Sequence, residues 1–314
     1  MTAVDTMTAL VLASRLGDRQ RPSLPAGEWH KLVAVLSDVG MSANDLFDQQ
    51  QSLSDLPALD PELADRLTML LEGSGSVAFE YEELRRRGVE AIAIGNEAYP
   101  ERLSRLLANA SPPVLFSVGD CSLLSRGGVA IVGSRNVSPD GAEVAKAVAR
   151  QTVELGLPVV SGGARGVDQL AMNAAFMAGG TVVGVLADSL LQRIRKPDIL
   201  RAIDSGNTCL VTQQHPDVGF SPAAAMARNK IVYALSDLTV VVATDEGSGG
   251  TWAGAVESLS RGFGRVAVWR GAGEGPGNAA LEPRGAIPIR DVAELHQLVA
   301  TEPEDPPEQL SMLG

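Results

Sequence analysis

The chain has 314 residues, of which 45% are hydrophobic and only 4% are aromatic, so it is long enough for more than one compact domain. Its formal net charge of −12 at pH 7 excludes a strongly basic coat that would bind DNA without specificity. The acidity belongs to the flanks, because Val129 to Arg290 holds 15 Lys/Arg and 14 Asp/Glu while the remainder holds 11 and 24. A local basic pocket is therefore compatible with the central region.

The cysteines and the N-terminus favour a cytoplasmic protein. Cys121 and Cys209 lie in separate apolar contexts without a CxxC spacing, which favours free buried thiols in a reducing compartment. Asp5 precedes the first basic residue, Arg15, and no long apolar region follows, so we expect no signal peptide. No run approaches the ~20 apolar residues of a membrane span, and we expect no membrane contact.

Residues 1–75 predict a small helical domain. Leu32 and Leu36 share the helical spacing of Glu28–Asp38, and Asp60 caps a helix that has Pro61 at its first position. Helix-hairpin-helix and SAM-like modules have this pattern, but so do many plain bundles. Gly73–Ser76 is interpreted as a linker.

Residues 76–128 are predicted to be a linker and lead-in segment. It contains a charged helix at Tyr81–Arg87 and strands at Val89–Ile94 and Val114–Val118. At the other end of the chain, residues 301–314 hold four acids and three prolines without a base, which is typical of a disordered acidic tail.

Residues 129–300 alternate apolar strand-like runs with segments of helical length. This pattern predicts an α/β fold, a Rossmann-like doubly wound and mostly parallel sheet that follows the small N-terminal helical domain. Ligands of such sheets bind at the carboxyl ends of the strands. The expected strands are Val129–Val132, Leu157–Val160, Thr181–Leu186, Thr208–Thr212, Leu238–Ala243 and Arg265–Trp269.

The first expected strand ends in a loop suited to phosphate. Gly133 permits close approach of backbone, Ser134 offers a hydroxyl and Arg135 offers a forked donor. Pro139 and Asp140 then begin a helix whose N–H groups add to an anion site. The alternative, equally weighted from these residues alone, is a plain turn with a solvated arginine.

A second loop, Ser161 to Asp168, follows the next strand. Glycine density there indicates a crowded or strained backbone, and Arg165 offers another cation. Asp168 caps N–H groups or orients Arg165, with capping favoured. The candidate binding residues in this loop are Ser161, Gly162, Gly163, Arg165 and Asp168.

Two further segments complete the candidate edge. A helix is expected to begin at Ala227, so that Arg228 and Lys230 oppose its macrodipole and are better explained by an anionic ligand, with Asn229 as a hydrogen-bonding group. A third glycine-rich turn follows the strand Leu238–Ala243. Its candidate residues are Ser248, Gly249, Gly250 and Thr251. The basic cluster of Arg193, Arg195, Lys196 and Arg201 is interpreted first as a solvated face.

The sequence carries no catalytic constellation and no metal-ligand spacing. The histidines, His30, His215 and His296, are scattered, and GxSxG, Walker A and GxGxxG motifs are missing at the relevant strand ends. We therefore expect no metal, no cofactor and no catalysis.

Four ordered motifs make residues 95–290 similar to the DNA-processing protein A (DprA/Smf) family. They are IVGSR (Ile131–Arg135), SGGARGVD (Ser161–Asp168), ARNKIVYALSD (Ala227–Asp237) and GSGGTWAGA (Gly247–Ala255). The resemblance implies a Rossmann-like domain that binds single-stranded DNA without catalysis, forms a homodimer and helps to load a RecA-type recombinase during transformation. It places Arg135, Ser161 to Arg165 and Arg228 to Lys230 in a basic pocket.

The chain departs from the family pattern at several places. Met172 stands where the family often has His, and Thr212-Gln213 replaces a Ser-Glu pair. A second resemblance, to LOG-type nucleoside-monophosphate phosphoribohydrolases, implies an enzyme, but the carboxylates expected after Thr251 are replaced by Trp252 and small residues, and the first acid is Glu257. A sensor of a nucleotide signal is the third possibility.

Overall fold

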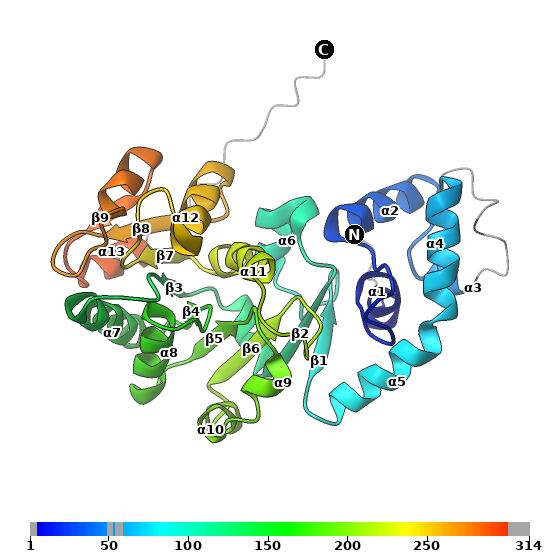
Figure 1. Ribbon diagram of the computed structural model, residues 1–314, viewed down its shortest axis with the longest axis horizontal. Helices are drawn as coiled ribbons and strands as arrows, with labels where there is room; N and C mark the ends of the chain where they lie inside the picture. The colour runs from blue at the N-terminus through cyan, green and yellow to red at the C-terminus, as the bar shows by residue number, and fades with distance from the viewer. Residues whose placement is uncertain (1–4, 49–52, 54–58, 301–314) are drawn as a thin grey trace, which may run out of the picture. The chain divides into compact units, whose positions relative to one another are not determined.

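The computed structural model describes residues 5–48, 53 and 59–300 (Figure 1). They fall into two compact units. The first unit comprises Met1–Arg126 and Thr181–Ile231, and the second comprises Gly127–Gly180 and Val232–Gly314. The acidic tail predicted at residues 301–314 lies outside the described residues. Within the described ranges, every helix is too short or too polar to cross a membrane.

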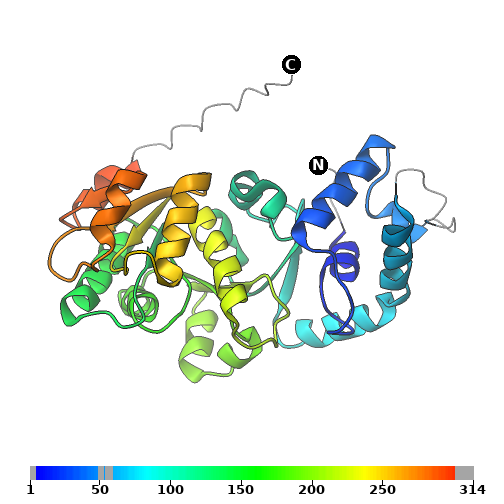
Figure 2. The same ribbon diagram turned by 45° about the horizontal axis from the view of Figure 1, so that its top comes forward.

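The first unit begins with helices grouped around α1, whose residues Leu10 and Leu12 are fully buried (Figure 2). The Asp60 side chain caps α4 through the Leu63 N–H at 2.8 Å, as its sequence predicts. The helices are α1 (Thr6–Ala13), α2 (Ala26–Asp38), α3 (Asp45–Asp48), α4 (Pro61–Glu72) and α5 (Ser74–Arg85).

The predicted linker at Gly73–Ser76 is wrong, because α5 begins at Ser74. Val77 is fully buried and anchors the first turn of α5, and the Ser76 hydroxyl donates to the Gly73 carbonyl at 2.8 Å. Gly73 itself lies against the guanidinium of the buried Arg21, which would collide with any Cβ at that position. A side chain at position 73 would therefore displace the Arg21 guanidinium, which lies in the connection between α1 and α2.

The strands of the first unit form a mixed sheet. β1 pairs antiparallel with β2, β2 pairs antiparallel with β6, and β5 pairs parallel with β6. The strands are β1 (Glu90–Ala93), β2 (Val114–Gly119), β5 (Val182–Val185) and β6 (Thr208–Thr212). The helices and 3₁₀ turns between them are α6 (Glu101–Leu107), η2 (Ala108–Ala110), η3 (Cys121–Ser125), α9 (Leu190–Arg193) and α10 (Pro197–Asp204). Helix α11 (Pro222–Leu235) begins in this unit and ends in the second.

The second unit is a parallel sheet with α7 and α8 on one face and α12 on the other (Figure 1). All four residues of β3 are buried, as a strand covered on both faces requires. The strands are β3 (Val129–Val132), β4 (Val159–Ser161), β7 (Leu238–Val241), β8 (Arg265–Trp269) and β9 (Ile287–Ile289). The helices are α7 (Pro139–Glu154), α8 (Val167–Met177), α12 (Gly249–Arg261), η4 (Asn278–Arg284) and α13 (Glu294–Ala300).

The strand order in the nine-stranded sheet is β1-β2-β6-β5-β4-β3-β7-β8-β9. This mostly parallel, doubly wound order confirms the predicted Rossmann-like α/β class. Chain order runs outward from β3 in one direction through β4 and resumes on its other side at β7, so the topological switch point lies between β3 and β7. Ligands of open α/β sheets bind just beyond that point.

Candidate functional site

The loops after β3 and β7 meet at the switch point. The Ser134 N–H donates to the Ala243 carbonyl at 2.9 Å, which fixes the first residues beyond both strands against each other. The Ser134 hydroxyl in turn accepts from the Asn136 N–H at 3.1 Å and tightens the turn that carries Arg135. The predicted loop is therefore built largely from its own backbone.

The loop after β4 packs against the same turn. The Val167 N–H donates to the Ser134 carbonyl at 3.3 Å. Gly166 has φ +88°, and a Cβ there would lie 2.3 Å from the Ser134 carbonyl oxygen. A Cβ on Gly133 would lie 2.6 Å from a methyl of Val167. Only glycine fits the closest of these contacts, so the three loops form one continuous edge within the second unit.

Two exposed guanidinium groups stand on this edge, and we call Arg135 and Arg165 the arginine rim. Arg165 donates from Nη2 to the Asn136 side-chain oxygen at 2.6 Å, which places it beside the turn that carries Arg135. The sequence predicted both arginines at strand ends, and the structure brings their loops together. The arrangement offers forked donors to an anion.

The remaining polar residues of the second loop have partners within the fold. Ser161 is fully buried and its hydroxyl donates to the Ile131 carbonyl at 2.7 Å. The buried Asp168 carboxylate accepts from the Ala164 N–H at 3.4 Å, which agrees with the capping interpretation. Gly162 and Gly163 are buried as well.

The third loop leaves its backbone open to solvent. Ser248, Gly249 and Gly250 are exposed, and Thr251 is half-buried. Ser248 is the N-cap residue of α12, and the first turn of that helix reads GGTW, so its positive end has no acid of its own. Helix N-termini of this kind favour anions through their N–H groups and macrodipole.

A segment that the sequence did not single out holds this third loop in place. Asn278 is fully buried; its amide oxygen accepts from the Thr244 N–H at 2.9 Å, and its amide nitrogen donates to the carbonyls of Val242 and Trp269, each at 2.8 Å. Gly277 lies so close to Asp245 that a Cβ would be 2.5 Å from its carbonyl carbon. The only signal for this support was the glycine-rich stretch GEGPGN after β8.

The predicted start of the helix at Ala227 is wrong. Helix α11 begins at Pro222, and the Ser221 hydroxyl accepts from the Ala224 N–H at 3.1 Å, as an N-cap does. Arg228 is therefore in the second turn, where the macrodipole is weak, so the argument from charge opposition fails. Arg228 is buried, and Asn229 and Lys230 are half-buried.

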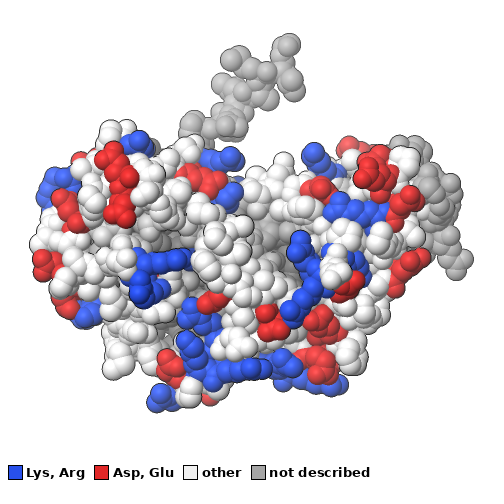
Figure 3. All heavy atoms as spheres, in the orientation of Figure 1, with Lys and Arg blue, Asp and Glu red and all other residues white. Residues whose placement is uncertain are grey.

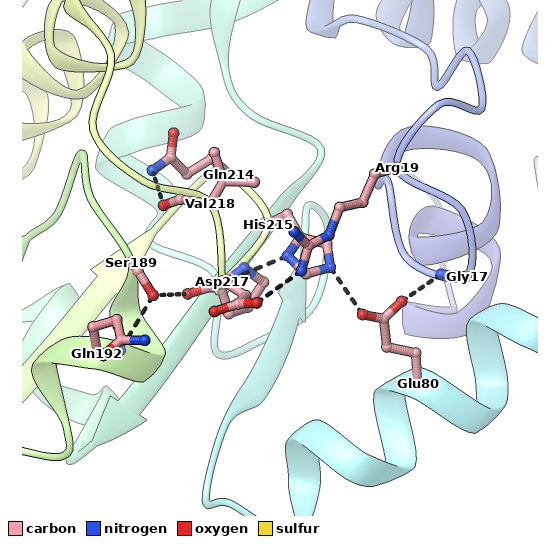
Figure 4. Close-up of polar contacts among 10 residues, drawn as sticks. Gly17, Arg19, Glu80, Ser189, Gln192, Gln214, His215, Asp217 and Val218 are labelled. Carbon is pink, nitrogen blue, oxygen red and sulfur yellow. Dashed lines mark hydrogen bonds and ion pairs between the residues drawn. The ribbon is translucent and has the colours of Figure 1, made fainter.

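The segment between β6 and α11 is held to the N-terminal helices within the first unit. His215 is buried, accepts from the Asp217 N–H through Nδ1 at 3.1 Å and lies 2.9 Å from the Glu80 carboxylate through Nε2 (Figure 4). These two contacts define the tautomer with hydrogen on Nε2. Glu80 also accepts from the Gly17 N–H at 2.6 Å, and Arg19 pairs with Asp217 at 2.8 Å. Sequence reasoning missed this network because its partners are far apart along the chain.

The basic cluster of the first unit is largely a solvated face. Arg193 is paired with Asp188 at 2.7 Å, and Arg195, Lys196 and Arg201 are exposed. Figure 3 shows basic side chains gathered over the region of α9 and α10. This agrees with the default interpretation of the cluster.

The position that would distinguish a phosphoribohydrolase holds an aromatic residue. Trp252 is buried, and the Arg284 guanidinium lies 5.0 Å from the centroid of its ring. Glu257 is two turns into α12 and pairs with Arg261 at 3.7 Å. Among the described residues, no three or more His, Cys, Asp or Glu side chains are grouped so that they could hold a metal ion.

Comparison with known proteins gives consistent matches. A Bacillus subtilis protein named DNA processing protein DprA is 32% identical over 168 residues, which are 52% of this chain and 56% of that protein. The chain thus spans about half the length of the curated relatives it matches. The X-ray structure of DNA processing protein A from Streptococcus pneumoniae has a TM-score of 0.69 at 21% identity and covers 94% of this chain and 98% of that one.

A structure of Helicobacter pylori DNA processing protein A, described by its single-stranded DNA binding mode, has a TM-score of 0.55 at 24% identity and covers 66% of this chain and 94% of that one. The fold is therefore that of a Rossmann-like α/β protein. The loops at its topological switch point carry groups that suit an anion. The model of the DNA recombination-mediator protein A family matches residues 90–280, and the chain belongs to that family.

Proposed function

We propose that the chain binds single-stranded DNA through the arginine rim and the exposed start of α12, without catalysing a reaction on it. The observation that carries this proposal is the contact of three strand-end loops at the switch point, with two exposed arginines on them. Family membership and the Helicobacter pylori relative, described as binding single-stranded DNA, support the choice of ligand. Phosphate contacts rather than base stacking supply the affinity, since aromatic residues make up only 4% of the chain.

The family motif extends the proposed site to Arg228, Asn229 and Lys230 on α11, and to Gly133, Ser134 and the Ser161 to Asp168 loop. We further propose that the protein acts as a homodimer that helps to load a RecA-type recombinase during DNA uptake and recombination. Sedimentation of the protein at rising concentration tests the dimer. Recombinase filament assembly on oligonucleotides, with and without the protein, tests loading.

The test of DNA binding is fluorescence anisotropy with labelled oligo-dT across a salt series. Arg135→Ala and Arg165→Ala are each expected to weaken binding about tenfold and to reduce the slope of log K against log salt by about 0.7. Arg150→Ala is the matched control, since Arg150 is an exposed arginine in the fourth turn of α7, which runs away from the loop edge. Equal affinity of the control and rim variants would contradict the proposal.

Release of adenine from AMP tests the enzymatic alternative. The proposal expects no release above that of buffer. If the wild type released adenine and Glu257→Gln did not, the function of this site would be nucleotide hydrolysis and not DNA binding.

A further inference from the structure

The two cysteines, which the sequence places 88 positions apart, meet in the first unit. Strands β2 and β6 are antiparallel, with Gly119 directly opposite Cys209. Side chains alternate along a strand, and directly opposed residues share a face, so the side chains of Ser117 and Cys209 lie on one face. The Cys121 sulfur lies 3.1 Å from the Ser117 hydroxyl and is therefore on that face too. Both thiols are free and Cys209 is buried, as expected, but Cys121 is only half-buried.

The two thiols differ in environment. Cys209 is fully buried, and Cys121 is partly accessible. The hydrogen bond from Cys209 lowers the pKa of Cys121 to about 6, although burial opposes this, and the Ser117 hydroxyl adds to the lowering. The same hydrogen bond and burial raise the pKa of Cys209. Cys121 is thus the thiolate at neutral pH and Cys209 the proton donor.

We propose that Cys121 and Cys209 form an oxidative modification site at which a hydroperoxide converts the pair into an intrachain disulfide. The accessible sulfur meets the oxidant, and the buried sulfur beside it closes the bond. Gly119 permits a close approach of β2 to the Thr208 carbonyl of the neighbouring chain segment, and the Cys121 sulfur lies 3.6 Å from the Gly119 carbonyl.

The chemistry balances with the hydroperoxide as the oxidant. The Cys121 thiolate attacks the terminal peroxide oxygen, the O–O bond breaks, and the leaving alkoxide or hydroxide takes a proton, which gives a sulfenic acid on Cys121. The Cys209 thiol then loses its proton as its sulfur attacks the Cys121 sulfur. The expelled hydroxide takes that proton and leaves as water. Two thiols are oxidised, and one peroxide is reduced to water and an alcohol or a second water.

The test uses the full chain with hydrogen peroxide and peptide mapping under non-reducing conditions. The wild type is expected to lose two hydrogens and to yield a Cys121–Cys209 linked peptide without forming covalent dimers. Cys209→Ala is expected to stop at a Cys121 sulfenic acid, trapped by dimedone, and Cys121→Ser to leave Cys209 unmodified. Interchain disulfides, or oxidation of Cys209 in Cys121→Ser, would overturn the proposal.

A second measurement starts from the wild type, so its main result does not depend on the folding of a variant. In the wild type, alkylation of Cys121 by iodoacetamide is expected to reach half its maximal rate near pH 6, as the lowered pKa requires. Cys209→Ala should slow this alkylation at neutral pH about tenfold, because the stabilising donor is gone. A wild-type midpoint near the ordinary thiol value, or equal labelling of both cysteines in the folded chain, would contradict the proposed roles.

Discussion

In the second unit, the segments at the loop edge are held by backbone contacts and by the buried amide of Asn278, whereas in the first unit the segment before α11 is held by polar and charged side chains. The Ser134 N–H donates to the Ala243 carbonyl, and the absence of a Cβ on Gly166 lets that residue approach the Ser134 carbonyl. The β6–α11 connection instead relies on His215 against Glu80 and on Arg19 against Asp217. The two regions therefore respond differently to substitution.

Backbone contacts leave little room for adjustment, since a collision with a carbonyl cannot be relieved by a change of rotamer. Side-chain pairs near the surface are individually weak and screened by salt. We expect the loop edge of the second unit to behave as a rigid platform, and single changes in the connection of the first unit to cost less stability. Four tests, taken from the largest expected effect to the smallest, examine this contrast.

Gly166→Ala should have the largest effect. It combines φ +88° with a Cβ 2.3 Å from the Ser134 carbonyl oxygen, so we expect the free energy of unfolding to fall by about 4 kcal/mol. The fraction of the variant that still folds is expected to lose DNA binding. Gly156→Ala is the control, because Gly156 has φ +72° but its Cβ would meet no described atom within 4 Å. Urea denaturation of both variants measures the difference. Equal losses would mean that conformation, not the close approach of loops, requires glycine at position 166.

Asn278→Ala should come next, with a loss of about 3 kcal/mol, since it leaves the Thr244 N–H and two buried carbonyls without their partner. Hydrogen exchange at Thr244 is expected to accelerate along with the loss of stability. Asn173→Ala, on the exposed side of α8, is the control and should change stability by less than about 0.5 kcal/mol. A small effect of Asn278→Ala would show that the third loop does not depend on this support.

The sequence predicted the parts of the fold that local pattern determines. The apolar run Val129–Val132 became β3 with the expected bounds, and the turns after three strands did gather at one edge, because parallel strands bring their carboxyl ends together. The predicted start of α11 is wrong because the N-cap Ser221 and Pro222 lie upstream of the basic motif, whose charges do not mark a helix terminus.

Contacts between distant segments could not be predicted. Asn278 supports Thr244 from 34 positions away, and nothing in the stretch GEGPGN indicates which backbone it will meet. His215 and Glu80 are 135 positions apart, and the Cys121–Cys209 pair depends on the antiparallel register of β2 and β6. A repeat or a spacing motif reveals local geometry, but pairing of this kind follows only from topology.

His215→Ala tests the first unit. His215 is buried, and its removal leaves the Asp217 N–H and the Glu80 carboxylate without this contact, so a loss of about 2 kcal/mol is expected. Glu80→Gln should cost about half as much, because the amide oxygen still accepts from Nε2. The control is His296→Ala at an exposed position of α13. Thermal unfolding ranks the stabilities of the three variants. If His215→Ala lost no more stability than His296→Ala, the contacts of His215 would not hold this connection in place.

Arg19 and Asp217 should show the smallest effect. Their ion pair is 2.8 Å long, but the side chains are 56% and 41% exposed, so a double-mutant cycle is expected to give a coupling of about 0.5 kcal/mol that falls as salt rises. Arg19→Ala, Asp217→Ala and the double variant are compared by urea denaturation at two ionic strengths. A coupling above about 1.5 kcal/mol, unchanged by salt, would place this pair with the rigid contacts of the second unit. The contrast between backbone and side-chain anchoring would then fail at the pair where it should be clearest.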